Sequence, residues 1–391
     1  MRTYTGVLDV PAGLPVSELD TPTLVIDLDA MERNVEQMAA FAAAHGVLWR
    51  PHAKMHKCAA LARHLIEAGA SGCCVQKVAE AQAMAAGGVT DIYISNEVLA
   101  HSKLKRLVAL AAQLHASGGR LAVAADSVLA VEALAGHVRQ HEQYQGPAPV
   151  DVLVEFNIGQ NRAGVQTASE VLMLAQTVSD VPSLRFAGLH AYHGGAQHIE
   201  SAVERHAVMQ QAYAKVHEVV QVLRAHGLDV VTVTGAGTGT FALEAASGLY
   251  TELQPGSFLL MDAHYACVQP AAQQPVFEQA LFVKTQVVSR ATHHAVVDAG
   301  HKSHAIDSGL PMVWNGGAQV QYGFGNGGDE HGLITALAGA ELPALGDVLW
   351  LVPGHCDPTI NLHDAMVGLR GGLLHGVVER VFQVDARGAL W

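Results

Sequence analysis

The chain alternates short apolar segments with longer amphipathic stretches, and this alternation occurs eight times between about residues 47 and 262. The apolar segments are typical of strands covered on both faces: 47–54, 72–78, 91–98, 120–127, 150–159, 184–192, 229–237 and 251–257. The intervening stretches have a helical period, as in the stripe of Leu104, Leu107, Val108, Leu110, Ala111 and Leu114. This pattern predicts an α/β fold with a (β/α)8 TIM barrel. A doubly wound open sheet is the alternative, weakened because no GxGxxG motif follows an early strand.

The pattern changes after about residue 265, where the long helical stripes end. Alternating apolar and polar residues then indicate strands at 280–291, 347–354 and 371–384. We therefore expect a barrel domain over 22–265. Segments 1–21 and 266–391 are expected to form a β-rich domain.

The segment 23–30 is typical of a strand that precedes the barrel. Asp29 lies at its end, and Glu32 follows three residues later. This spacing predicts a capping box, with Asp29 as the N-cap of a helix over 30–44.

The charge balance and the cysteines restrict the class of protein. The chain has 23 basic and 36 acidic residues, a formal net charge of −13, which argues against a nucleic-acid-binding protein. No apolar run reaches the roughly 18 residues of a membrane span, so no membrane is expected. The N-terminus has no signal-peptide core. Five cysteines without metal-finger spacing favour a reduced, cytoplasmic chain.

Active sites of TIM barrels lie at the C-terminal ends of the strands, so polar residues late in each strand are candidates. The first predicted barrel strand closes with RPHAKMHK at 50–57. Lys54 follows an apolar run there, and partial desolvation would lower the pKa of its amine. Such a lysine is a usable nucleophile toward a carbonyl group.

Two glycine-containing segments end the seventh and eighth predicted strands. They are TGAGTGT at 234–240 and QPGS at 254–257. Glycines let backbone N–H groups approach an anion, and barrels frequently bind phosphate after these two strands. We expect Thr238, Gly256 and Ser257 to hold a single phosphate ester, because the chain lacks a lysine-bearing P-loop.

A histidine and an aspartate two residues apart follow the apolar segment at 347–354. In an extended segment, His355 and Asp357 would face one site while Cys356 faces away. One imidazole and one carboxylate with open positions describe a catalytic divalent-metal site. The carboxylate favours the harder ions Mn²⁺ or Mg²⁺.

Several of these segments resemble the fold-type III pyridoxal-phosphate (PLP) enzymes. They are RPHAKMHK, GCCVQKVAEA, ISNEV, YHGGAQH, TGAGTGT, YTELQPGSF and GHCDPTINLHD. The match is to the branch of D-threonine aldolase, 3-hydroxy-D-aspartate aldolase and eukaryotic-type D-serine dehydratase, and it runs from about Asp20 to the C-terminus. The resemblance implies an alanine-racemase-like barrel with a β domain that carries the metal ligands, PLP attached to Lys54, and a homodimer.

The resemblance also implies roles for residues around the cofactor. Gln76 and Arg162 match positions near the cofactor ring, and Arg162 is expected to hold its phenolate side through charge-assisted hydrogen bonds. Tyr192 matches a tyrosine at the cofactor. Tyr265 is a further candidate, and packing at a domain interface is the alternative for it.

Around the metal, the resemblance assigns His355 and Asp357 as ligands. It implies that Asp329, in GGDEHG, holds metal-bound waters. His198 matches the position of a base that removes the proton of the substrate's β-hydroxyl, either directly or through a metal-bound water, and His193 is the alternative.

The resemblance implies an aldolase that cleaves 3-hydroxy-D-amino acids, D-threonine or 3-hydroxy-D-aspartate, to glycine and an aldehyde. A D-serine or 3-hydroxyaspartate dehydratase on the same scaffold is the alternative, but the dehydratase branch has Cys where this chain has Asp357. Lys302 and His304 can offer a cation to a substrate β-carboxylate. A cofactor-carrying protein without turnover would lack the second domain, and a racemase would lack the metal motif.

Overall fold

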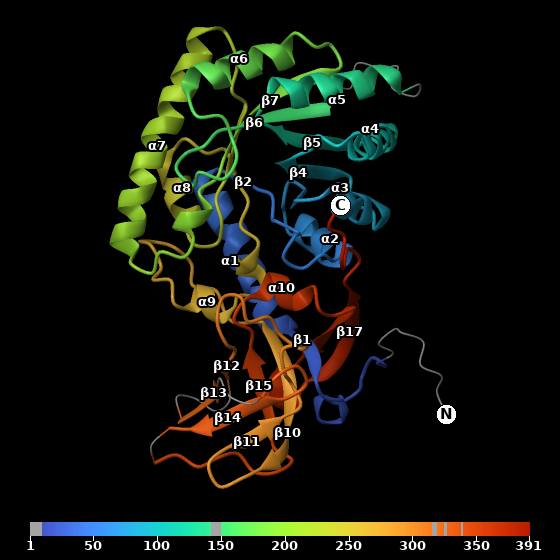
Figure 1. Cartoon of the computed structure of the whole chain (residues 1–391), viewed down its shortest axis with the longest axis vertical. Coiled ribbons are helices and arrows are strands. Elements are labelled where there is room, and N and C mark those ends of the chain that lie inside the picture. The colour runs from blue at the N-terminus through green and yellow to red at the C-terminus, as the bar shows by residue number, and fades with distance from the viewer. Residues whose placement is uncertain (1–9, 142–149, 315–318, 324–326, 338) are drawn as a thin grey trace.

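The computed structural model describes residues 10–141, 150–314, 319–323, 327–337 and 339–391. Within them, eight parallel strands form one sheet in the order β2-β9-β8-β7-β6-β5-β4-β3 (Figure 1). The strands are β2 (Leu48–Trp49), β3 (Cys73–Val75), β4 (Asp91–Glu97), β5 (Arg120–Ala125), β6 (Val150–Glu155), β7 (Leu184–Ala191), β8 (Thr232–Gly235) and β9 (Glu252–Leu253). A parallel bridge between His52 and Cys74 links the two ends of this order and closes the barrel. All eight predicted strands and the TIM barrel are confirmed.

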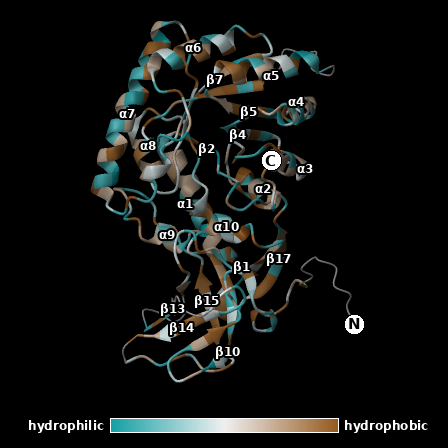
Figure 2. Cartoon of the chain, in the orientation of Figure 1, coloured by the Kyte–Doolittle hydropathy of each residue, from teal (hydrophilic) through white to brown (hydrophobic). Residues whose placement is uncertain are grey.

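Helices cover the outside of the barrel. They are α1 (Leu28–His45), α2 (Ala59–Glu67), α3 (Val78–Ala86), α4 (His101–Ala116), α5 (Val128–Gln140), α6 (Ala168–Ser179), α7 (Ala202–Ala225) and α8 (Phe241–Ser247). The six residues of the predicted stripe on α4 are all buried. Figure 2 shows hydrophilic residues along the outward-facing α7 and hydrophobic residues on the barrel strands. No helix among the described residues is long and apolar enough to cross a bilayer.

A second sheet lies below the barrel in Figure 1. Its strands are β1 (Thr23–Asp27), β10 (Leu281–Arg290), β11 (Ala295–Val297), β12 (Met312–Val313), β13 (Val320–Gly323), β14 (Gly332–Ala336), β15 (Val348–Val352), β16 (Ala365–Arg370) and β17 (Val377–Gln383). Strand β1 pairs antiparallel with β10 and parallel with β16. It therefore belongs to this sheet, although the predicted barrel range 22–265 contains it.

The predicted cap of α1 is wrong by two residues. The helix begins at Leu28, and its N-cap is Asp27, whose carboxylate accepts hydrogen bonds from the N–H groups of Asp29 and Ala30. Asp29 and Glu32 instead bind the guanidinium of Arg370, on β16 of the other sheet. Arg370, on the other side of the domain junction, thus binds both carboxylates that the spacing assigned to a capping box.

The predicted strand at 371–384 is interrupted at its start. Gly371 and Gly372 have φ of 88° and 80°, and a short helix α11 (Gly372–His375) follows before β17. The left-handed glycines reverse the chain, so that β17 pairs antiparallel with β16.

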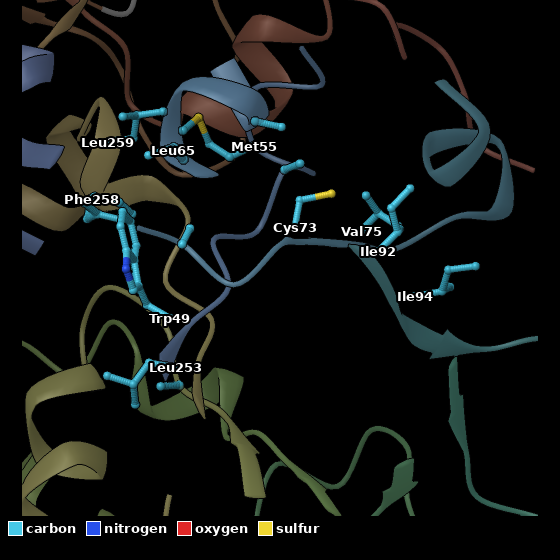
Figure 3. Close-up of a cluster of buried hydrophobic side chains, with 14 of the residues drawn as sticks. Trp49, Met55, Leu65, Cys73, Val75, Ile92, Ile94, Leu253, Phe258 and Leu259 are labelled. Carbon is cyan, nitrogen blue, oxygen red and sulfur yellow. The ribbon is translucent and has the colours of Figure 1, made fainter. Parts of the chain in front are cut away.

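Apolar packing beneath the barrel mouth holds the first strand in place. The indole of Trp49 contacts the edge of Phe258, with ring centroids 6.1 Å apart, and Figure 3 shows both beside Leu253. Met55 and Leu65 are also fully buried, so the turn that carries Lys54 is anchored on both sides of that residue.

Candidate active site

A cavity of about 310 Å³ opens at the C-terminal ends of the barrel strands. Each residue predicted to bind the cofactor lines it: Lys54, Gln76, Arg162, Tyr192, Thr238, Gly256, Ser257 and Tyr265. They come from segments up to about 200 residues apart, and the barrel brings them together because its parallel strands all end at one face.

Lys54 is bonded to one of the predicted metal ligands. Its Nζ lies 2.6 Å from Oδ1 of Asp357. Burial lowers the pKa of Lys54, but the charge and hydrogen bond of Asp357 raise it more, so the net pKa lies above the ordinary lysine value. The expected lowering of this amine pKa is therefore wrong while the salt bridge persists. The same contact lowers the pKa of Asp357 to about 2 against the opposing effect of burial.

A hydrogen-bonded group of three side chains lies on the wall beside Lys54. Nε2 of Gln76 is 3.0 Å from Nε2 of His52 and donates to Oγ of Ser95 at 2.9 Å. Burial and the positive charge of Lys54 hold the pKa of His52 well below its usual value. His52 is therefore neutral at neutral pH, and this network fixes the position of the Gln76 amide.

The glycine segments form a further part of the cavity wall. Ala236 has φ of 70°, and a Cβ added at Gly237 would lie 2.4 Å from Oε1 of Gln197. A Cβ added at Gly256 would lie 2.9 Å from the carbonyl oxygen of His52. Only glycine permits such close packing, which fits a wall built from backbone as a phosphate site requires. Oγ1 of Thr238 accepts a hydrogen bond from the Phe258 N–H at 2.9 Å, which ties the two segments together.

Aromatic side chains and an arginine complete the cavity. The Arg162 guanidinium lies 5.6 Å from the ring centroid of Tyr192, within the range of a cation–π contact. Burial raises the pKa of Tyr192, and burial with the nearby Arg162 lowers the pKa of His190 to about 3. Both side chains are thus uncharged, and Arg162 supplies positive charge at this wall.

The predicted metal ligands lie next to each other, but not for the expected reason. The segment is not extended, because Cys356–Ile360 forms a short helix, α10, with His355 as its N-cap. Pro358 is compatible with this first turn, where its missing N–H costs no hydrogen bond. Nε2 of His355 is still 3.7 Å from Oδ2 of Asp357. We refer to His355 and Asp357 as the His–Asp pair.

Asp307 orients the imidazole of this pair. Its Oδ2 lies 2.7 Å from Nδ1 of His355, which leaves Nε2 directed toward Asp357. Such an outer carboxylate fixes the tautomer of a metal-binding histidine. The described residues contain no group of three or more His, Cys, Asp or Glu side chains arranged to hold a metal ion. The His–Asp pair, with Nε2 and Oδ2 3.7 Å apart, fits a two-ligand site with open positions.

The candidate base His198 borders the same region. Its ring stacks on His264 with centroids 3.7 Å apart, and lies 4.5 Å from Tyr265. Burial, His264, His355 and Lys54 lower the pKa of His198 to about 4, so the imidazole is neutral and able to accept a proton at neutral pH. The alternative, His193, packs against the loop at Gly159. Neither histidine lines the cavity itself, but His198 contacts the lining residue Tyr265.

Three further candidates lie away from the cavity. Asp329, expected to hold metal-bound waters, is exposed, and its backbone carbonyl accepts a hydrogen bond from the Lys302 N–H. Lys302 forms an exposed salt bridge with Glu330, and His304 is fully buried. Neither lines the cavity, so the hypothesis that they bind a β-carboxylate is not supported.

Sequence reasoning missed several residues that the structure places here. His52, Ser95 and Gln254 line the cavity late in their strands, where the rule that selected Gln76 could also have selected them. Asp307 and His264 had no such signal, because each is brought to the site by a loop or short helix after a long separation in sequence.

Comparison with known proteins agrees with this architecture. Residues 26–264 match the family described as alanine racemase, N-terminal domain. Residues 280–369 match a putative serine dehydratase domain. The first match covers the barrel and the second covers most of the β domain.

Individual relatives extend over almost the whole chain. The 3-hydroxy-D-aspartate aldolase of Paracoccus denitrificans (strain Pd 1222) is 42% identical, over 98% of this chain and 97% of its own. The crystal structure of D-threonine aldolase from Filomicrobium marinum is 42% identical, with a TM-score of 0.91, and covers 98% of this chain and 100% of its own. The D-threo-3-hydroxyaspartate dehydratase of Delftia sp. (strain HT23) is 30% identical, over 87% of this chain and 92% of its own. The chain therefore belongs to the fold-type III PLP-enzyme family that joins an alanine racemase N-terminal domain to a serine dehydratase-like domain and includes these aldolases.

Proposed function

We propose that this protein is a PLP- and divalent-metal-dependent aldolase that cleaves 3-hydroxy-D-amino acids to glycine and an aldehyde. The observation that carries this proposal is the 2.6 Å contact between Lys54 Nζ and Asp357 Oδ1. Lys54 lines the cavity, and this contact brings the carboxylate of the His–Asp pair to its amine, which supports one small substrate reaching both. The aldolase relatives that match nearly the full chain support the same activity.

In this proposal, the cofactor-binding residues act at Cα of the substrate, and the metal and His198 act at its β-hydroxyl. When bound, PLP supplies an electron sink for the charge at Cα, and a divalent cation lowers the pKa of a coordinated hydroxyl. Thr238, Gly256 and Ser257 hold the phosphate, and Arg162 holds the ring. The neutral imidazole of His198 accepts the proton of the β-hydroxyl, which initiates cleavage of the Cα–Cβ bond.

We propose Mn²⁺ or Mg²⁺ as the metal, because the second ligand is the carboxylate of Asp357. The neighbouring thiol of Cys356 is fully buried, and burial together with Asp262 raises its pKa well above the usual value. It is thus a poor source of the thiolate that a softer ion prefers.

We further propose a cytoplasmic homodimer. All five cysteines are free in the structure, in keeping with a reducing compartment. Size-exclusion chromatography with light scattering tests the dimer, and a monomeric mass would contradict it.

A dehydratase is the second candidate, because the Delftia enzyme is also a relative. Incubation of the purified protein with D-threonine and with D-threo-3-hydroxyaspartate separates the two activities. Glycine as the product supports the aldolase, and a 2-oxo acid without glycine refutes it. Glycine release should stop with a chelator and return with Mn²⁺. Lys54→Ala should remove the yellow colour of bound PLP, whereas Asp357→Ala should keep the colour and abolish cleavage.

A further inference from the structure

One buried carboxylate joins the two short helices that carry opposite sides of the candidate site. Asp262 is fully buried between the end of the barrel and the β domain. Its Oδ1 accepts a hydrogen bond from the N–H of Tyr265 at 2.9 Å. Its Oδ2 accepts one from the N–H of Cys356 at 3.0 Å. The side chain therefore caps α9 (Ala263–Ala266) and also the first residue of α10.

Helices α9 and α10 carry residues of different parts of the candidate site. Helix α9 carries Tyr265, which lines the cavity, and His264, which stacks on His198. Helix α10 carries Asp357 and begins directly after His355. Figure 1 shows α9 and α10 next to each other at the junction of barrel and β domain.

Backbone contacts confirm that the segments lie side by side. The Ala263 N–H donates to the Pro353 carbonyl at 2.9 Å, and the His264 N–H donates to the Gly354 carbonyl at 3.2 Å. Asp262 adds a side-chain link to the N-termini of both helices. Residues 262 and 356 are 94 positions apart, so no local sequence preference sets this contact.

The link is stiff because a buried carboxylate tolerates few alternatives. Its hydrogen-bond partners are the N–H groups of Tyr265 and Cys356 and the Cys356 thiol. A displacement of either helix would leave a carboxylate oxygen without a donor in a site that water does not reach, and an unpaired buried charge is expensive. The arrangement thus disfavours any relative movement of α9 and α10.

We propose that Asp262 is a positioning residue that sets the place of the His–Asp pair relative to the cavity wall at Tyr265. This inference rests on the proposed function, in which the pair binds a divalent cation. It extends that function because a residue outside the cavity, Asp262, would set the distance between the His–Asp pair and the cavity wall at Tyr265.

Two substitutions of Asp262 test its hydrogen bonds to the N–H groups of Tyr265 and Cys356. Asp262→Ser keeps a good N-cap for α9, but its hydroxyl is too short to reach the Cys356 N–H as well. Asp262→Asn keeps the size of the side chain, and its amide –NH₂ faces an N–H donor in place of the acceptor oxygen. The matched control is Asp27→Asn, since Asp27 caps α1 through the N–H groups of Asp29 and Ala30 and touches neither half of the site.

The measurement is Mn²⁺ binding to the PLP-loaded protein by calorimetry, with PLP retention followed by visible absorbance and Tm by calorimetric scanning. We expect both Asp262 variants to bind Mn²⁺ on the order of 10- to 100-fold more weakly, as for other residues that support metal ligands. Asp262→Ser should keep the PLP absorbance. Asp27→Asn should leave the Mn²⁺ affinity unchanged, because Oδ1 alone accepts both capping hydrogen bonds and the amide oxygen can do the same.

Mn²⁺ affinities within twofold of the wild-type value would overturn the proposal. So would a parallel loss of PLP, Mn²⁺ and fold in both variants, because Asp262 would then be a general structural residue. Failure of the wild-type protein to bind Mn²⁺ at all would instead contradict the proposed function. The two failures are therefore distinguishable.

Discussion

Glu244 offers a quantitative test of how burial controls charge beneath the proposed phosphate site. This residue of α8 is fully buried, and its Oε1 accepts a hydrogen bond from Oγ1 of Thr240 at 2.8 Å. The Thr240 hydroxyl in turn accepts from the Gln197 amide, whose oxygen accepts from the Gly239 N–H. The carboxyl thus supports the loop that carries Thr238.

Burial raises the pKa of Glu244 from 4.5 to about 8. The folded protein therefore keeps the proton that the unfolded chain releases above about pH 4.5. The stabilising effect of the neutral acid is complete below that pH, and it is lost as the pH rises through 8. Linkage converts this change in pKa to about 5 kcal/mol in total, of which about 2.5 kcal/mol falls between pH 5.5 and 7.5.

Glu244→Gln replaces the acid by a neutral group of the same shape and removes this proton. Urea unfolding of the apoprotein, followed by tryptophan fluorescence, measures the free energy of unfolding at both pH values. We expect the variant to gain about 2.5 kcal/mol relative to wild type between pH 5.5 and 7.5. The same substitution at the exposed Glu67 of α2 is the control, and it should leave the pH dependence unchanged. Parallel curves for Glu244→Gln and wild type would refute the reasoning.

Three further predictions concern the cavity and the His–Asp pair. Gly256→Ala should cost about 1–3 kcal/mol by overpacking against the carbonyl of His52, and should weaken PLP binding in an absorbance titration while Mn²⁺ binding to the PLP-free protein is unchanged. Asp307→Asn should weaken Mn²⁺ binding roughly 10- to 100-fold in calorimetry with normal PLP absorbance, and an unchanged affinity would contradict its orienting role. PLP should strengthen Mn²⁺ binding, because Lys54 then stops competing for the carboxylate of the pair; equal Mn²⁺ affinities with and without PLP would exclude this coupling.

The barrel and its cavity follow from patterns that are local in the sequence. The eight strands were predictable because each carries an apolar run between amphipathic helices, and parallel strands must end at one face. Residues late in those strands, such as Gln76 and Tyr192, therefore had to meet in one place. Their chemical roles came from the resemblance of their motifs to those of known enzymes.

Local sequence patterns could not predict the contacts between elements that are distant in the chain. Strand β1 has the apolar composition of a barrel strand, yet it pairs with β10 and β16, because hydrogen-bond partners are chosen by topology and not by composition. Arg370 likewise draws Asp29 away from the expected cap, across 341 residues. The predicted geometry of the His–Asp pair was wrong because Cys356 begins a helix whose first N–H is capped by Asp262.

The amino-acid order thus dictates which strands and helices form and which polar groups reach the barrel mouth, since both depend on periodicity over a few residues. The protonation of buried side chains, in contrast, depends on the tertiary structure. Lys54 and Asp357 are 303 residues apart, and their 2.6 Å contact reverses the expected shift in the lysine pKa. The reason is physical: a pKa depends on burial and on charges within a few ångströms, and only tertiary packing brings those charges together.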